Sequence, residues 1–153
     1  MEKLAKIINR QITFEVYDTS KNWIADFPTE NWALVIVAED ENKNYFDEII
    51  RKAIDRNVGY IHCVGKQHDL IHNMADEEIV FRDVDIEKLH LPKHIIMTTG
   101  IEDFENGIWY GIYVTHNEET EINQVVILDI TKKAFEKTLK LVRKFENGYL
   151  PKG

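Results

Sequence analysis

Two short apolar runs enclose an amphipathic segment in the middle of the chain. The runs cover residues 33–38 and 58–64, and almost every position in them is apolar. Between them, apolar residues recur at helical spacing from Tyr45 to Ile54, after a capping Asn44 and before Asn57, which ends the pattern. Apolar strands joined by an amphipathic helix are typical of a parallel sheet that is covered by helices on both faces.

The same alternation continues towards the C-terminus. We expect core strands at 94–99 and 122–130, with a helix after each. The first of these helices begins after Asp103, and Gly107 and Gly111 in it permit a close approach to a neighbouring element. Thr131 caps the second helix, which ends at Asn147-Gly148. A short helix is predicted at 67–74, followed by an exposed connection at 76–87.

The N-terminal residues show weaker patterns. Residues 12–17 alternate like an edge strand, while Leu4, Ile7 and Ile8 are compatible with a short helix. Trp23, Phe27 and Trp32 are interpreted as a lid over the core.

We therefore expect one α/β domain over residues 1–153, built as a three-layer sandwich. Its four-stranded core sheet is mainly parallel, and the core strands lie in the order second, first, third, fourth. The N-terminal segment is expected either at an edge of the sheet, as an additional strand, or over one of its faces.

Composition and charge narrow the partners of this domain. Nineteen basic and 27 acidic residues give a net charge of −8, which disfavours nucleic acid as a direct ligand and allows a basic protein partner. The charge is uneven, because residues 131–153 carry +5 and the first 130 residues carry −13. One cysteine, no apolar leader and no run approaching about 20 apolar residues predict a cytoplasmic protein without a membrane span.

A crevice is the first candidate for chemistry. Brought together at the carboxyl ends of two neighbouring strands, Glu39, Asp40, Thr98 and Thr99 would offer oxygen ligands to a hard cation. The layout is similar to that of phosphoacceptor receiver domains, but the acceptor aspartate and the matching lysine are missing. A merely solubilising role for the acidic strand exit is the favoured interpretation.

Two further motifs are interpreted as structural. His68 and His72 have the spacing of a helical zinc pair, but no third ligand is marked, so we expect a surface pair and no bound metal or cofactor. Cys63 is adjacent to His62 on a strand, where neighbouring side chains point to opposite faces, so we expect a buried, inert thiol.

Residues 30–131 resemble an uncharacterised bacterial domain of unknown function. The similarity lies in the strand 33–38, the segment 95–99 with its following acids, the aromatic helix 104–113 and the strand near 126–130. Gly100-Ile101 stands where the relatives have Trp-His after the paired threonines. The resemblance implies the fold and transfers no catalytic residues.

The favoured function is an interaction protein, most concretely an immunity protein or antitoxin that neutralises a basic toxin by direct binding. Its acidic surface would speed association with a cationic partner. The expected partner-binding residues are Asp76, Glu77, Glu78, Asp83, Asp85, Glu102, Asp103 and Glu105. The alternatives are a small-molecule or nucleotide-binding enzyme that uses the crevice, and a receiver-like scaffold without chemistry.

Overall fold

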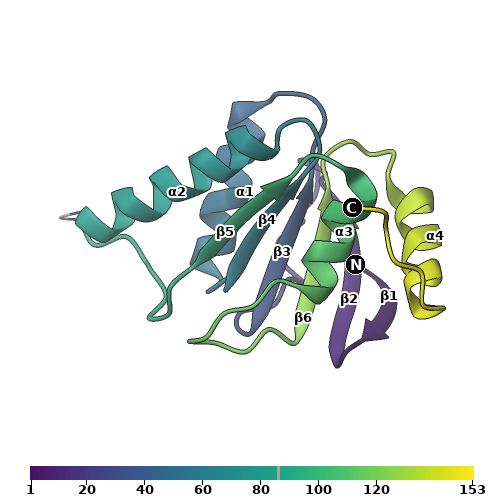
Figure 1. The fold of residues 1–153 in the computed structure, drawn as a ribbon. Coiled ribbons are helices and arrows are strands. Elements are labelled where there is room, and N and C mark those ends of the chain that lie inside the picture. Colours follow the sequence, from purple (N-terminus) through teal and green to yellow (C-terminus); the bar gives the residue numbers. More distant parts are fainter. Residues whose placement is uncertain (86) are drawn as a thin grey trace.

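The computed structural model describes residues 1–85 and 87–153, and it shows an α/β fold in which one mixed sheet lies between two layers of helices (Figure 1). The strands are β1 (Glu2–Ile7), β2 (Arg10–Val16), β3 (Trp32–Val37), β4 (Tyr60–Val64), β5 (Met97–Ile101) and β6 (Gln124–Asp129). The helices are α1 (Lys43–Asp55), α2 (His68–Val84), α3 (Phe104–Tyr113) and α4 (Phe135–Glu146).

The six strands lie in the order β1-β2-β6-β3-β4-β5, and every pairing except β1 with β2 is parallel. The predicted order of the core strands was wrong: β6, not β5, is the second neighbour of β3. The connections from β3 to β4 through α1 and from β4 to β5 through α2 run in the same direction along the sheet. Right-handed crossovers therefore place α1 and α2 on the same face. The crossover through α3 runs back across β4 and β3, which places α3 on the other face.

The N-terminus forms a hairpin rather than a helix followed by a strand. Ile8 and Asn9 have φ of 46° and 64°, the paired left-handed conformation of a tight two-residue turn. The short helix proposed for Leu4, Ile7 and Ile8 was therefore wrong. The predicted strand at 12–17 exists as β2, but it lies inside the sheet, and β1 forms the edge.

Several element boundaries differ from the prediction. Helix α2 continues to Val84, so most of the expected connection at 76–87 is helical; residue 86 of that segment lies outside the described residues. Strand β5 begins at Met97 rather than at residue 94. Asn42, not Asn44, caps α1, and the cap position of α4 is Ala134. Helix α1 ends before Asn57, and helix α4 ends at Asn147-Gly148, as predicted.

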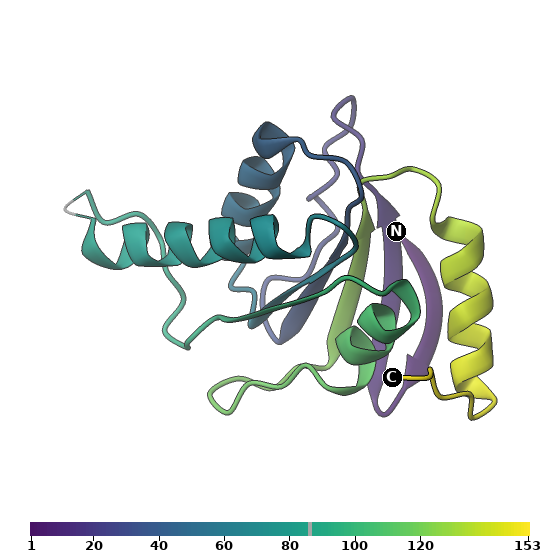
Figure 2. The same ribbon diagram turned by 45° about the horizontal axis from the view of Figure 1, so that its top comes forward.

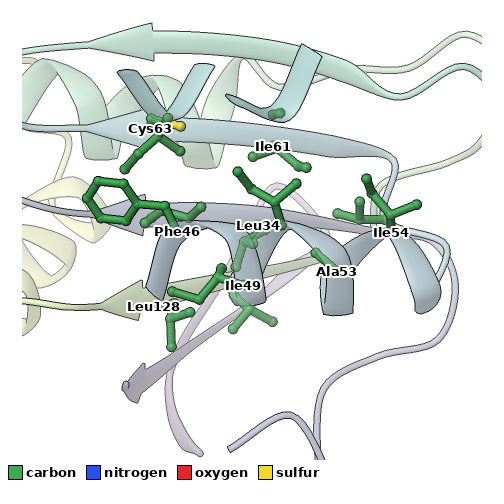
Figure 3. Close-up of a cluster of buried hydrophobic side chains, with 14 of the residues drawn as sticks. Leu34, Phe46, Ile49, Ala53, Ile54, Ile61, Cys63 and Leu128 are labelled. Carbon is green, nitrogen blue, oxygen red and sulfur yellow. The ribbon is translucent and has the colours of Figure 1, made fainter. Parts of the chain in front are cut away.

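A core lies on each face of the sheet. On the face covered by α1 and α2 (the α1/α2 face), Figure 3 shows Phe46 and Ile49 of α1 pointing towards Leu34 and Ile61 of the strands. The segment between β2 and β3 adds Trp23 and Phe27 to this core, which confirms that the aromatic cluster covers it.

On the opposite face (the α3/α4 face), glycines set the distance between helix and sheet. A Cβ on Gly107 would lie 2.6 Å from Val64 Cγ1, and a Cβ on Gly111 would lie 2.6 Å from Val35 Cγ2. The predicted close approach at both glycines is confirmed.

Candidate functional site

The four residues of the predicted crevice are not brought together. Thr98 and Thr99 lie on the edge strand β5, where they align with Ile61 and His62 halfway along β4, and β4 separates them from β3. Glu39 and Asp40 follow β3 at its carboxyl end, where Glu39 is half-buried and Asp40 is exposed. The arrangement therefore lacks the cluster of oxygen ligands that a cation needs.

The two threonines also point to opposite faces of β5 and already have partners. Thr98 Oγ1 donates to Asp76 Oδ1 at 2.6 Å, on the side of α2. Thr99 Oγ1 lies 2.7 Å from His62 Nδ1, on the side of α3. The Thr98 hydroxyl thus ties α2 to the edge strand, and the Thr99 hydroxyl ties the edge strand to His62 of β4.

Sequence reasoning missed a buried polar cluster around His62. Its Nε2 donates to the carbonyl of Gly107 at 3.0 Å, so in the neutral ring Nδ1 accepts from Thr99. The ring stacks on Tyr110, whose hydroxyl lies 3.0 Å from that of Tyr60. Burial lowers the pKa of His62 to about 4 and raises that of Tyr60.

Both ring nitrogens of His62 are engaged, so the cluster has no free base and serves to hold α3 on β4. The signal was present in the sequence, since Tyr60 and His62 alternate on one face of a strand that is otherwise apolar.

The two smaller motifs are placed as follows. His68 Nδ1 lies 2.9 Å from the carbonyl oxygen of Gly65, and His72 Nε2 lies 3.3 Å from Asp76 Oδ2. Within residues 1–85 and 87–153, no three His, Cys, Asp or Glu side chains are grouped to hold a metal ion. Cys63 is buried on the face opposite His62, as predicted, and burial raises the pKa of its thiol.

The topological switch point lies between β3 and β6, where Asp129 takes the place that the prediction gave to the threonines. This buried carboxylate accepts hydrogen bonds from the backbone N–H groups of Thr131 and Ala134, at 2.8 and 2.9 Å. Its oxygens thus organise the entry into α4 and explain how this helix begins without a capping side chain at Ala134.

The eight predicted partner-binding acids do not form one surface. Five lie on or at the end of α2, and three lie at the start of α3, on elements that cover opposite faces of the sheet. Glu78 pairs with Arg51 and Arg82, Asp85 accepts from backbone N–H groups, and Asp103 caps α3. Asp76 and Glu105 are bonded to Thr98 and Tyr149.

Three of these acids, Glu77, Asp83 and Glu102, are exposed and make no hydrogen bond or ion pair to the described part of the chain. Two of the three lie on the second half of α2. This helix extends beyond the edge strand β5, as both ribbon views show (Figure 2).

The protruding half of α2 also exposes apolar side chains. Val80, Phe81 and Val84 have relative exposures of 62, 52 and 70%. With Glu77, their spacing of three and four places them on one side of the helix, away from the buried Arg82. We call Glu77, Val80, Phe81, Asp83 and Val84 the α2 surface.

A hollow flanks the α2 surface on each side. One, of about 240 Å³, lies between α1 and α2 and is lined by Asp47, Met74 and Phe81, among others. The other, of about 300 Å³, lies between α2 and the segment before β5 and is lined by Val80, Leu91 and Ile95, among others. Ile95 is itself 62% exposed, so the apolar area continues beyond the helix.

Residues 13–144 match a family described as a domain of unknown function, DUF7684, and the chain belongs to this family. The match confirms the predicted resemblance and extends it at both ends. No curated protein sequence matches the chain, and no solved structure matches it. No helix in the described part of the chain is long and apolar enough to cross a membrane.

Proposed function

We propose that this protein is an acidic, cytoplasmic interaction protein that binds a basic protein partner through the α2 surface, as an immunity protein or antitoxin binds and neutralises a toxin. The observation that carries the proposal is the exposure of Val80, Phe81 and Val84 beside the unpaired carboxylates of Glu77 and Asp83.

An apolar centre with charged residues around it is the usual anatomy of a protein–protein interface. The apolar side chains supply desolvation energy on binding, and the acids favour a cationic partner and speed its approach. The chain carries −13 over its first 130 residues, which adds to that attraction. The single cysteine, reduced and buried, suits a cytoplasmic location.

The crevice enzyme has less support, because Glu39 and Asp40 lie apart from Thr98 and Thr99. The proposal and this alternative make opposite predictions for substitutions, so one set of variants separates them.

The test needs a defined partner, so the neighbouring genes are first searched for a basic toxin domain, and a toxin found there is used as the partner. Rescue of growth and the association rate are measured for the wild type, for Glu77→Lys/Asp83→Lys and for Val80→Ser/Val84→Ser. We expect the charge reversal to slow association about ten-fold at low salt and less as salt rises. The serine variant should weaken binding mainly through faster dissociation.

Glu39→Gln/Asp40→Asn and Thr98→Ala/Thr99→Ala serve as the crevice controls. Because Thr98 and Thr99 also make internal hydrogen bonds, circular dichroism first checks that these variants fold, and an interaction protein should then keep growth rescue. If the crevice variants abolish rescue while the α2 variants keep it, the interaction function is wrong and the enzyme is favoured.

A further inference from the structure

A second surface, on the opposite face and at the opposite edge of the sheet, has the reverse charge. Helix α4 packs beside β1 on the α3/α4 face, whereas α2 lies against β4 and β5 on the α1/α2 face. A groove of about 560 Å³ runs between α4, the start of α3 and the C-terminal residues. We call it the lysine groove. It is lined by Asp103, Phe104, Glu105, Lys137, Lys140, Leu141, Lys144, Tyr149, Pro151 and Lys152.

Four ammonium groups face this groove in a chain whose net charge is −8. Lys137, Lys140 and Lys144 follow one another at spacings of three and four along α4, and Lys152 comes from the C-terminal segment. None of the four forms an ion pair with a described residue. Their charge is therefore available to a ligand.

The two acids of the groove are already used by the protein. Asp103 Oδ2 accepts from both the backbone N–H and the side-chain amide of Asn106, each at 2.9 Å. Glu105 accepts the hydroxyl of Tyr149. Both carboxylates are thus turned to internal donors but keep their charge, and the groove is positive because its four lysines outnumber these two acids.

Aromatic rings hold two of the lysines in place. Lys137 Nζ lies 4.1 Å from the ring centroid of Phe104, and Lys144 Nζ lies 5.2 Å from that of Tyr149. Contacts of this kind order side chains that are otherwise mobile. Helix α3 begins at the same place, so the positive end of its dipole adds to the field of the lysines.

We propose that the lysine groove binds a small polyanion that carries two or more phosphate groups. Ammonium groups act as point charges that suit phosphate oxygens in many orientations, and the groove has no arginine fork to select a planar carboxylate. Its volume lies within the range of about 300–1,000 Å³ that is usual for small-molecule sites.

Isothermal titration with inorganic tripolyphosphate tests the proposal on the full chain. The groove variant is Lys137→Gln/Lys140→Gln/Lys144→Gln. The matched control, Lys132→Gln/Lys133→Gln/Arg143→Gln, removes the same charge from exposed positions outside the groove. We expect saturable binding by the wild type, a loss of about ten-fold or more in the groove variant, and a change below about three-fold in the control.

A Lys→Arg version of the groove variant should keep most of the binding, which shows that charge rather than a folding defect is responsible. Equal weakening in the groove and control variants, or no saturation, would overturn the proposal in favour of unspecific attraction. So would self-association of the wild type that the groove variant abolishes, since the occupant would then be the acidic surface of a second copy. The α2 surface is unchanged throughout, so failure here is separate from failure of the proposed function.

Discussion

The two faces of the sheet are covered in different ways, although the strands are apolar on both. On the α1/α2 face, large side chains such as Phe46 and Ile71 fill the space, and α2 extends past the edge strand. On the α3/α4 face, Gly107 and Gly111 bring α3 close to the strands, and α4 buries Leu141, Val142 and Phe145.

The difference explains where apolar side chains reach solvent. A helix that stays on the sheet buries its apolar stripe and presents only charges, as α4 does with its lysines. Helix α2 extends past the sheet, and its second half exposes Val80 and Val84 on the side away from the buried Arg82. A surface suited to a protein partner and a surface suited to an anion follow from these two arrangements.

The largest expected effect concerns how the α1/α2 face holds the protruding helix. Arg82 is buried, and its guanidinium donates to Asp55 at 2.7 Å and to the carbonyl of His90 at 2.9 Å. Arg82→Ala removes both hydrogen bonds and the packing of the buried arginine stem, and because Asp55 can be solvated we expect a cost of about 2–4 kcal/mol in urea unfolding. Asp83→Ala, one residue along on the exposed side, should change stability by less than about 0.5 kcal/mol. Similar losses in both variants would contradict this division of α2.

The α3/α4 face should be the more sensitive one to acid. The pKa of His62 is about 4 in the folded protein, against about 6.5 when unfolded, because burial disfavours the charged ring. The neutral ring of His62 makes its full contribution to the free energy of unfolding above pH 6.5. This contribution is lost as the pH falls towards 4, and the loss reaches about 3 kcal/mol. Urea unfolding of the wild type and His62→Gln at pH 7 and pH 4.2 measures it. The variant should lose less than the wild type; an equal loss would show that His62 does not titrate this way.

Glycine packing on the same face should give an intermediate effect. Gly111→Ala places a Cβ 2.6 Å from Val35 Cγ2, an overpacking that costs about 1–3 kcal/mol. Alanine has a higher helix propensity than glycine, which offsets about 1 kcal/mol of this cost. We therefore expect the free energy of unfolding to fall by about 1 kcal/mol in thermal unfolding. Val35→Ala should rescue part of the strain in a double-mutant cycle. Additive losses would indicate that the two side chains do not collide.

The smallest effect belongs to the α2 surface. Val84 is 70% exposed, so Val84→Ala should change the free energy of unfolding by less than about 0.5 kcal/mol. A loss above 1 kcal/mol that depends on protein concentration would show that Val84 is covered by a second copy in solution.

The candidate site was less accessible from the sequence than the fold. The sequence showed that Asp76, Glu77 and Asp83 are acidic, but their segment was predicted to be a connection. In a connection, the positions of these acids relative to Val80 and Val84 could not be predicted. Only the continuation of α2 to Val84 gives them helical spacing and places the apolar residues on one side. The role of His62 could not be predicted for a similar reason, since its partners Thr99 and Gly107 come from distant segments.

The sequence by itself determined the alternation of strands and helices, the α/β class and the glycine contacts of α3. These features follow from local periodicity, which each segment carries in its own residues. Tertiary structure alone decided that β6 and not β5 lies beside β3, which separates Thr98 and Thr99 from Glu39 and Asp40. The physical reason lies in the right-handed crossovers. Handedness fixes which face a helix covers once the connection runs one way or the other along the sheet, but it does not fix which way the connection runs. Long-range packing of the two cores then selects it.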